Sequence, residues 1–416
     1  MQMNELFRVA LGLDAPWQVT KVEFSESDGK LQLWLDFPAG STFPCPVCAK
    51  SGCGAYDTEE RTWRHLNFFQ HQTLLHARQP RIQCPEHGVK TVEVPWARPG
   101  SGFTLLMEAF ILLLVQGGMT AAQVGRLIGE HDTRIWRVLQ HYVQDGRRRA
   151  DFSDVSLVGM DETSRARGHS YITLFMDLMP GHRRVLFVCP ERDAQTVGFF
   201  REDFVQHGGD PDAIRRVCMD MSPAFMKGAA EHLPHAQITF DPFHVAKLAG
   251  EAVDAVRREE QKRRPELKGT RYLWLKNEWN HTEKQAEQWA AIKGCRLETG
   301  RAWLLKSALQ DVFLPENRVD GPALLTKWCA WAQRSRLVPM LELARTLRRH
   351  WTGVVNWFDS QISNGVLEAI NGLVQAAKRR ARGYRNVNHL ITMIYLLLGK
   401  LDFHLPTLSP AVTHTK

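Results

Sequence analysis

Two short loops rich in metal ligands constrain the N-terminal part of this chain more than any other feature of the sequence. The first reads Cys45-Pro-Val-Cys48 and the second reads Cys84-Pro-Glu-His87. Each supplies two side chains of the kind that bind Zn²⁺, and two such pairs satisfy the tetrahedral coordination of a closed structural zinc site. We therefore predict that Cys45, Cys48, Cys84 and His87 bind one zinc ion and draw the two loops together.

The distribution of the cysteines favours a metal site over disulfide bonding. The chain has eight cysteines in 416 residues, and four of them lie within the first 90. That number is too small for a disulfide scaffold. The four later cysteines are single and scattered, as small buried hydrophobic residues are. Four side chains near the two loops remain alternative ligands: Cys53, His65, His71 and His76.

Around these loops the sequence alternates between apolar and polar residues, as β-strands do. Residues 17–37 form two alternating runs about a turn at Ser27-Asp28-Gly29, a pattern typical of a hairpin. Six apolar side chains are predicted to share the inner face of this hairpin: Val22, Phe24, Leu31, Leu33, Leu35 and Phe37. Residues 63–66 and 73–76 alternate in the same way. We therefore assign residues 1–98 to an N-terminal zinc-binding β module.

Residues 99–150 have the pattern of a helix-turn-helix DNA-binding domain. An apolar helix is predicted over 103–115. A second is predicted over 119–129, with Thr120 as its N-cap and Gly129 at its end. A generic helical hairpin fits the same spacing.

A further helix of this domain is predicted to begin at Asp132. It would present three side chains to DNA: Thr133, Arg134 and Arg137. The basic run at 145–150 that follows has the composition of a linker. The zinc module upstream and the basic character of the chain favour DNA binding over a generic helical hairpin.

Charge and hydropathy narrow the class of protein. The chain has 53 Lys and Arg against 45 Asp and Glu, a net charge of +8 that favours a polyanionic partner. Its longest apolar runs fall well short of the roughly 17 to 20 residues that a membrane span needs. The N-terminus has no basic region followed by an apolar core, so it does not resemble a secretory signal. Membrane and secreted proteins are therefore excluded.

Beyond Asp154 the pattern changes to short strands separated by helices. A helix is predicted over 193–207, and five strands over 155–160, 169–177, 184–189, 214–219 and 237–240. The order of three strands, helix, strand, helix, strand matches an α/β fold of the ribonuclease-H-like type, in which the first and fourth strands lie side by side. Asp161 and Asp220 stand at the ends of those two strands, so we expect their carboxylates to lie close together.

This pair of carboxylates, with a third, has the composition of a metal-dependent phosphoryl-transfer site. Two adjacent carboxylates on a rigid sheet repel each other unless a divalent cation neutralises them. In two-metal catalysis one ion activates the attacking oxygen and the other stabilises the leaving oxygen. Taken singly, Asp161 or Asp220 is more often a strand-end cap or a surface charge, so the prediction depends on their combination with Glu368.

Glu368 heads a helix with an unusual charge pattern. Six polar side chains recur at helical spacing and form one stripe: Asn364, Glu368, Asn371, Gln375, Lys378 and Arg382. No acid follows Glu368 as far as Leu401, whereas several basic residues do, among them Lys378, Arg379, Arg380, Arg382 and Arg385. This pattern favours a metal-binding carboxylate beside a bound phosphate backbone. A solvated basic helix with one chance acid is the alternative.

Four segments of the chain together resemble the DDE transposases of bacterial insertion sequences, specifically the ISL-three family. They are Gly159-Met-Asp161-Glu-Thr, Val217-Cys-Met-Asp220-Met-Ser, Asp241-Pro-Phe-His244 and Glu368-Ala-Ile-Asn-Gly with the basic run after it. The resemblance covers nearly the whole chain, including the zinc module and the helix-turn-helix. It departs from the family pattern at His87, where a cysteine is usual, although zinc accepts either ligand.

The resemblance implies a catalytic triad and its cofactors. Asp161, Asp220 and Glu368 would bind two Mg²⁺ ions, for which Mn²⁺ can substitute, beside the structural Zn²⁺ of the N-terminal module. Asp241 and His244 match a second acid and histidine motif near the active site of related transposases, and their role stays open.

The resemblance also implies an all-helical insertion ahead of Glu368. Five helices are predicted there, over 246–264, 284–292, 300–310, 322–333 and 339–349, and tryptophans are concentrated among them. Most of these tryptophans are expected in a core. Four segments follow the helix-turn-helix in this domain scheme: 151–244 as the first part of the catalytic core, 245–355 as the insertion, 356–402 as the core helices with Glu368, and 403–416 as a tail.

The expected function is that of a transposase that binds terminal inverted repeats, cleaves the transposon end and transfers the freed strand to target DNA. Double-stranded DNA would be its partner, with a homodimer or a larger assembly on the DNA, in the bacterial cytoplasm at the nucleoid. Two alternatives remain open: a structure-selective ribonuclease-H-like nuclease without strand joining, and a DNA-binding regulator without catalysis. Strand joining distinguishes the first from a transposase, and metal-dependent cleavage excludes the second.

Overall fold

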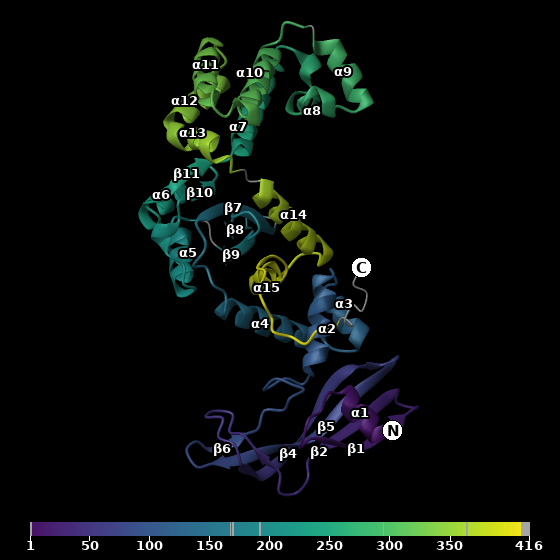
Figure 1. Cartoon of the computed structure of the whole chain (residues 1–416). Coiled ribbons are helices and arrows are strands. Elements are labelled where there is room, and N and C mark those ends of the chain that lie inside the picture. Colours follow the sequence, from purple (N-terminus) through teal and green to yellow (C-terminus); the bar gives the residue numbers. More distant parts are fainter. Residues whose placement is uncertain are drawn as a thin grey trace, which may run out of the picture. The chain divides into compact units, whose positions relative to one another are not determined.

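The computed structural model describes residues 2–166, 168, 170–190, 193–293, 295–362 and 365–408. The chain forms two compact units. One takes in the chain up to Asp145 together with the segment from Asp402 onward, and the other comprises Gly146–Leu401. Figure 1 labels the helices and strands of both units.

A β-sheet forms the N-terminal part of the first unit. After helix α1 (Met3–Ala10), its six strands are β1 (Gln18–Ser25), β2 (Lys30–Asp36), β3 (Thr42–Phe43), β4 (Cys53–Phe68), β5 (His71–Cys84) and β6 (Gly88–Thr91). The sheet has the order β1-β2-β5-β4-β3, and β6 pairs with β5. The predicted hairpin at 17–37 and the strand pattern at 63–66 and 73–76 are thus confirmed.

Burial on the hairpin follows the prediction only in part. Leu31, Leu33 and Leu35 are almost fully buried in the core of this sheet. Phe24 lies opposite Leu31, as predicted, but it is 47% exposed. The reason is that β1 is an edge strand, so its outer end lacks a neighbour on one side.

Three helices follow this sheet in the chain: α2 (Leu105–Gln116), α3 (Ala121–Ile128) and α4 (Asp132–Arg148), whose last three residues belong to the second unit. The Thr120 hydroxyl caps α3 in a reciprocal capping box with Gln123, and Gly129 ends it at φ +74°. The linker predicted at 145–150 is wrong, because α4 continues to Arg148. The glycine in this run, Gly146, does not end the helix, because a glycine inside a helix costs only about 1 kcal/mol relative to alanine.

A buried carboxylate ties these helices to the segment before them. Glu108 of α2 is fully buried, and its oxygens accept hydrogen bonds from Arg98 Nε at 3.0 Å, Ser101 Oγ at 2.7 Å and Tyr142 Oη at 2.6 Å. Tyr142 belongs to α4, so one acid connects α2, α4 and residues 98–101. Burial, followed by the Glu108 charge, raises the pKa of Tyr142, which therefore stays a neutral donor.

A mixed sheet organises the second unit. Its strands are β7 (Leu157–Ala166), β8 (Ser170–Asp177), β9 (Arg184–Cys189), β10 (Arg216–Met219) and β11 (Gln237–Phe240), with the helices α5 (Gln195–Gln206) and α6 (Pro223–His232) between the later strands. The sheet order is β11-β10-β7-β8-β9. Strands β7, β8 and β9 are antiparallel, whereas β10 is parallel to both β7 and β11. The first and fourth strands are therefore neighbours, as predicted.

Side chains form hydrogen bonds with backbone groups on the outer edge of strand β9. The Tyr395 hydroxyl accepts a hydrogen bond from the backbone N–H of Val188 at 3.0 Å, and Arg147 Nη1 donates to the Leu186 carbonyl at 2.6 Å. Arg147 also forms an ion pair with Asp203 at 2.7 Å. These contacts occupy backbone groups that an edge strand would otherwise expose.

Helices make up the rest of the second unit. They are α7 (Pro242–Glu260), α8 (Arg271–Leu275), α9 (Glu283–Lys293), α10 (Glu298–Val312), α11 (Gly321–Arg334), α12 (Val338–Arg349), α13 (Trp351–Ser360), α14 (Gly365–Arg380) and α15 (Val387–Leu398). Short 3-10 turns lie at Pro211–Ala213, Pro265–Leu267, Glu278–Asn280 and Pro315–Asn317. No described helix is long and apolar enough to cross a membrane.

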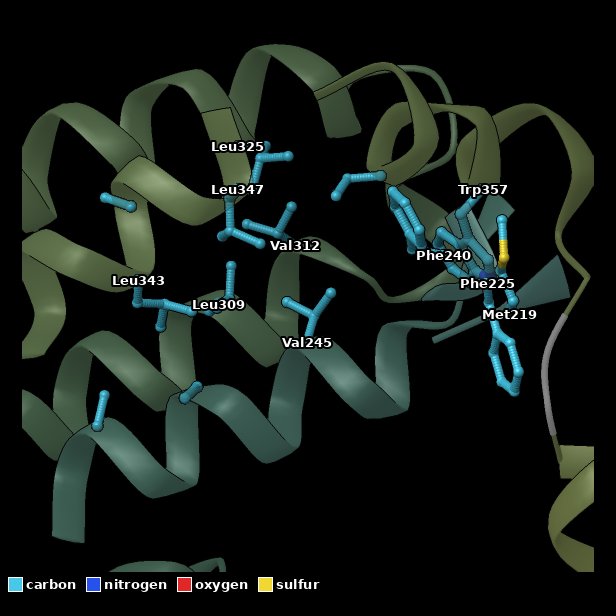
Figure 2. Close-up of a cluster of buried hydrophobic side chains, with 14 of the residues drawn as sticks. Met219, Phe225, Phe240, Val245, Leu309, Val312, Leu325, Leu343, Leu347 and Trp357 are labelled. Carbon is cyan, nitrogen blue, oxygen red and sulfur yellow. The ribbon is translucent and has the colours of Figure 1, made fainter. Parts of the chain in front are cut away.

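The helices α7 and α10–α13 share one hydrophobic core with the end of the sheet. Figure 2 shows Met219 and Phe240 of the sheet close to Trp357, and Val245 of α7 facing Leu309 and its neighbours. The tryptophans at 274, 289 and 328 are buried, as predicted, whereas Trp279 is 78% and Trp331 42% exposed. The helical segment therefore packs onto the sheet through a continuous apolar interface.

Candidate active site, metal centre and DNA-binding surfaces

The two N-terminal loops meet as predicted. The Sγ atoms of Cys48 and Cys84 are 3.8 Å apart, and His87 Nδ1 lies 3.6 Å from Cys84 Sγ and 4.0 Å from Cys45 Sγ. A tetrahedral ion with Zn–S bonds of about 2.3 Å holds its sulfur ligands roughly 3.8 Å apart. All four ligand atoms lie within 4.8 Å of one another, so these residues form a Cys₃His set that fits zinc.

The side chains considered as alternative ligands have other partners. Cys53 Sγ donates to the Lys50 carbonyl, His65 Nδ1 contacts Thr104 Oγ1 at 2.8 Å, and His76 Nδ1 contacts Thr62 Oγ1 at 2.9 Å. His71 lies edge-on to the Phe24 ring.

Backbone N–H groups favour the metal-binding form of one ligand. A hydrogen bond from the backbone of Glu86, followed by one from the side chain of His87, lowers the pKa of the Cys84 thiol to about 6. The thiolate is the form that binds metal.

The surface predicted to read DNA lies at the start of α4. Thr133 and Arg137 are exposed. Arg134, by contrast, is already bound within the protein: its Nη1 donates to Glu130 Oε2 at 2.6 Å, and its guanidinium lies over the Phe103 ring. These contacts hold Arg134 as a brace between α4 and the start of α2.

Three acidic residues stand at matching positions on the parallel strands. In the register of β10 and β7, Cys218 pairs with Gly159, so Asp220 and Asp161 each lie two residues beyond a paired position. Met219 pairs with Phe240 on β11, which places Asp241 beside Asp220. Neighbouring strands lie about 4.8 Å apart, so the register brings Asp161, Asp220 and Asp241 to one side-by-side row. Asp161 lies within β7, which continues to Ala166, and not at its end as predicted.

Backbone and side-chain donors orient these carboxylates. Asp161 Oδ1 accepts from the Glu162 backbone N–H at 2.8 Å, and its Oδ2 accepts from Asn371 Nδ2 at 2.6 Å. Asp220 Oδ1 accepts from the Ser222 N–H at 3.0 Å. Asp241 is buried and caps α7 by accepting from the Phe243 N–H at 3.1 Å.

The electrostatics show that these acids act on one another. Burial, and in smaller measure the charge of Asp220, raises the pKa of Asp161, while His244 opposes that shift. Burial also raises the pKa of the Cys218 thiol, to which the charges of Asp241 and Asp161 both contribute. Ionising Asp161 is therefore costly unless a cation is present.

Glu368 reaches this region from helix α14. Glu368 is exposed, but the protein around its carboxyl group removes part of the solvent from it. This desolvation, followed by the charge of Asp241, raises the pKa of Glu368, whereas His244 lowers it. Gly159 on β7 allows the close approach of the helix, because a Cβ there would lie 3.0 Å from Leu367 Cδ1. Leu367, Ile370 and Val374 form the buried face of α14.

The polar stripe of α14 packs on strand β7. Asn371 donates to Asp161, Gln375 Nε2 donates to Thr163 Oγ1 at 2.8 Å, and Lys378 Nζ donates to the Ser164 carbonyl at 2.6 Å. The stripe ends there: Arg382 lies beyond the helix, which stops at Arg380, and Asn364 is outside the described residues. Lys378 is thus held by the protein, whereas four basic residues after it are exposed: Arg379, Arg380, Arg382 and Arg385.

The three predicted catalytic acids do not form a closed ligand cage. Within the part of the chain that the structure describes, the Cys₃His set is the one group of three or more Cys, His, Asp or Glu side chains with ligand atoms all within 4.8 Å. The sequence predicted Asp161 and Asp220 as neighbours but not the direct bond from Asn371 to Asp161. A signal for that bond was present, because Asn371 follows Glu368 at helical spacing on the same stripe.

Comparison with known protein families identifies the chain. Residues 158–394, more than half of the sequence, match the model of the ISL3 family's DDE transposase domain, described as a transposase. The chain belongs to the ISL3 family of DDE transposases. Residues 92–143 match the helix-turn-helix domain of the same family, and residues 41–87 match the zinc-finger of transposases of IS204, IS1001, IS1096 and IS1165.

Known transposases are similar along almost their whole length. The transposase for insertion sequence element IS1557 of Mycobacterium tuberculosis is 30% identical, over 100% of this chain and 99% of the relative. The transposase for IS1001 of Bordetella parapertussis is 26% identical, over 91% of this chain and 95% of the relative. The predicted family and enzyme class are therefore confirmed, and the ISL3 transposase carries a DNA-binding helix-turn-helix and a zinc-ribbon domain with a Cys₃His set.

Proposed function

We propose that this transposase binds the terminal inverted repeats of an insertion sequence, and that Asp161, Asp220 and Glu368 catalyse end cleavage and strand transfer. The observation that carries the proposal is the register of β7 and β10, which brings Asp161 and Asp220 side by side on a rigid sheet. Glu368 joins them from α14, since its carboxyl is subject to the charge of Asp241 in the same row.

We infer further that the catalytic core has the ribonuclease-H-like fold. The sheet order β11-β10-β7-β8-β9 supports this, because the first three strands form an antiparallel meander and the fourth pairs in parallel with the first. We also propose that two or more copies of the chain act together, since moving a DNA segment requires both of its ends.

The residues of the row fit Mg²⁺. Carboxylate oxygens are the ligands that Mg²⁺ prefers, and the ion usually keeps several waters, so it does not require a closed cage of protein ligands. Burial and the charge of Asp220 raise the pKa of Asp161, which supports the proposal that a cation binds beside this carboxylate. When bound, divalent ions would stabilise the charge on the attacking and leaving oxygens of a phosphodiester.

The chain's own residues orient this site. The Glu162 N–H and the Asn371 amide fix the Asp161 carboxylate, and the Ser222 N–H fixes Asp220. We propose that Asp241 and His244 have an accessory role. Asp241 adds negative charge beside Asp220, and His244 favours the ionised forms of Asp161 and Glu368.

Cleavage and joining by the full chain test this proposal. A labelled duplex carrying one transposon end is incubated with target DNA and Mg²⁺ or Mn²⁺, and nicked and joined products are separated. We expect a nick at the 3′ end of the element, followed by covalent joining to target. Cleavage without joining would support a nuclease instead, and binding without any cleavage would support a regulator.

We predict that Arg137→Ala reduces discrimination between the end sequence and random DNA. An exposed arginine on the second helix of a helix-turn-helix reads base edges, and its loss typically costs about 1–3 kcal/mol, or roughly tenfold or more in specificity. The measurement is the ratio of the two dissociation constants at one salt concentration. Arg201→Ala, which removes an exposed arginine from α5, is the matched control. If Arg137→Ala discriminates between the two DNAs as well as wild type does, another surface of the protein must contact the bases.

We predict a different effect from removing Arg379 and Arg380 together. These exposed residues follow the anchored Lys378, and we propose that they contact phosphates rather than bases. Their replacement by alanine should weaken binding to end and random DNA alike, and should reduce the slope of log K against log salt by about 2. Arg345→Ala with Arg349→Ala, two exposed arginines of α12, controls for net charge. A salt slope equal to that of wild type would contradict this role.

A further inference from the structure

The amide nitrogen of Asn371 forms a hydrogen bond, whereas its amide oxygen is buried and has no partner among the described residues. Its Nδ2 donates to Asp161 Oδ2 at 2.6 Å. Its Oδ1 is shielded from solvent and accepts no hydrogen bond from any residue that the structure describes. A buried amide oxygen left unsatisfied costs about 1–3 kcal/mol, so such an atom beside an active site indicates a missing partner.

The orientation of the amide is fixed by its neighbour. Were the amide rotated by half a turn, Oδ1 would face the Asp161 carboxylate, and two hydrogen-bond acceptors would be in contact. When Asp161 is ionised, as a metal ligand is, the nitrogen must therefore face Asp161 and the oxygen must face away. The two atoms of an amide are about 2.2 Å apart, so Oδ1 lies within roughly 5 Å of the carboxylate oxygen.

The position of Asn371 on its helix points to the same site. Asn371 follows Glu368 by three residues, and residues at this spacing lie on one face of a helix. The same face bonds to β7 through Gln375 and Lys378, so this part of α14 is held against the strand that carries Asp161. Asn371 therefore shares a helix face with Glu368 and bonds directly to Asp161.

We propose that Asn371 is a further ligand residue of the divalent-metal site, supplying its Oδ1 to the cation while its amide nitrogen holds Asp161. Asparagine carbonyl oxygens are accepted ligands of hard divalent cations. This inference rests on the proposed function of Asp161. It adds an uncharged oxygen to a site whose three acids alone do not enclose an ion.

Metal binding by the full chain tests this role without requiring catalysis. Mn²⁺ is titrated into the protein, and free Mn²⁺ is measured by electron paramagnetic resonance. Asn371→Leu, which keeps the shape but removes both polar atoms, should weaken Mn²⁺ binding about tenfold or more. Asn371→Asp restores an oxygen and should bind Mn²⁺ more tightly than Asn371→Leu. Equal affinity of wild type and Asn371→Leu would overturn the proposal, as would an Asn371→Asp variant no better than Asn371→Leu.

The matched control is Gln375→Leu. Gln375 lies one turn further along α14 and bonds to Thr163 and Ser164, but not to Asp161. Both leucine variants should lower the melting temperature in EDTA, whereas only Asn371→Leu should weaken Mn²⁺ binding. If both weaken it equally, helix docking explains the effect and the ligand role is refuted.

Asp161→Asn separates this inference from the proposed function. An Asp161→Asn variant that binds Mn²⁺ and cleaves DNA like wild type would refute the function proposed for the acidic row. Loss of Mn²⁺ binding in Asp161→Asn, together with normal binding in Asn371→Leu, would refute the role of Asn371 alone.

Discussion

Asp161→Asn, Asp220→Asn and Glu368→Gln should each abolish both end cleavage and strand transfer, with a loss of about a thousandfold or more. The reason is that metal-assisted charge stabilisation at a phosphodiester contributes several kcal/mol, and each 1.36 kcal/mol corresponds to a factor of ten in rate. The amides keep the shape of the side chains and remove their charge, so the substitutions test metal binding rather than folding. Nicking and joining of a labelled transposon end are measured beside end binding.

Binding to transposon ends should survive all three substitutions, because the helix-turn-helix precedes the catalytic residues in a separate compact unit. Glu162→Gln, which changes the acid next to Asp161, is the matched control and should retain activity. Full strand transfer by Glu368→Gln would refute the triad and assign the third position to another acid.

Asp241→Asn is the informative fourth variant. Asn caps helices as well as Asp does, so this change keeps the start of α7 and removes only the charge beside Asp220. A loss of activity comparable to that of Asp220→Asn would place Asp241 among the metal-binding acids. Activity close to wild type would restrict Asp241 to capping α7.

The elements of the fold could be predicted because their signals are local. Strands β8 and β9 are largely apolar, and Thr120 with Gly129 marks both ends of α3. The neighbouring positions of β7 and β10 could be predicted from the order of strands and helices, because that order is typical of a fold in which the first and fourth strands pair. The prediction of a linker at 145–150 failed because it depended on contacts that are distant in sequence. Arg147 in this charged run binds the Leu186 carbonyl and Asp203, which the local sequence does not indicate.

Parts of the site depend on pairings that no local pattern encodes. The row of three acids results from parallel register, which brings Asp241 level with Asp220 although a whole helix separates them in sequence. Arg134 was predicted to contact DNA because of its place on α4, and the contacts of its guanidinium with Phe103 and Glu130 were not predicted. The stripe on α14 was recognised from its spacing, yet its contact with β7 became evident only from the folded chain.

Loss of the Cys₃His set should have the second large effect. Zinc binding to a structural site contributes about 10–16 kcal/mol of folding free energy at neutral pH, more than the whole stability of most domains. The four ligands come from the loop after β3 and from the end of β5 with the turn that follows it. Without the ion, these segments would hold three thiols and an imidazole together with nothing to offset the cost.

We therefore expect about one zinc per chain in the purified protein, and its loss in Cys48→Ala. Circular dichroism during heating should show that the N-terminal sheet melts at a much lower temperature in this variant or after chelation. Binding to transposon ends should fall with it, because residues 102–104 dock on β4 through hydrogen bonds with Arg64 and lead directly into α2.

Cys53→Ala is the matched control for the zinc site. Cys53 is a buried cysteine of the same module, and its thiol donates to the Lys50 carbonyl instead of joining the ligand set. Its replacement removes a comparable volume and should cost at most about 1–2 kcal/mol, with zinc content unchanged. A Cys48→Ala protein that lacks zinc but melts and binds transposon ends like wild type would show that the sheet needs no metal. Equal zinc loss in Cys53→Ala would show that the four predicted ligands are not the binding set.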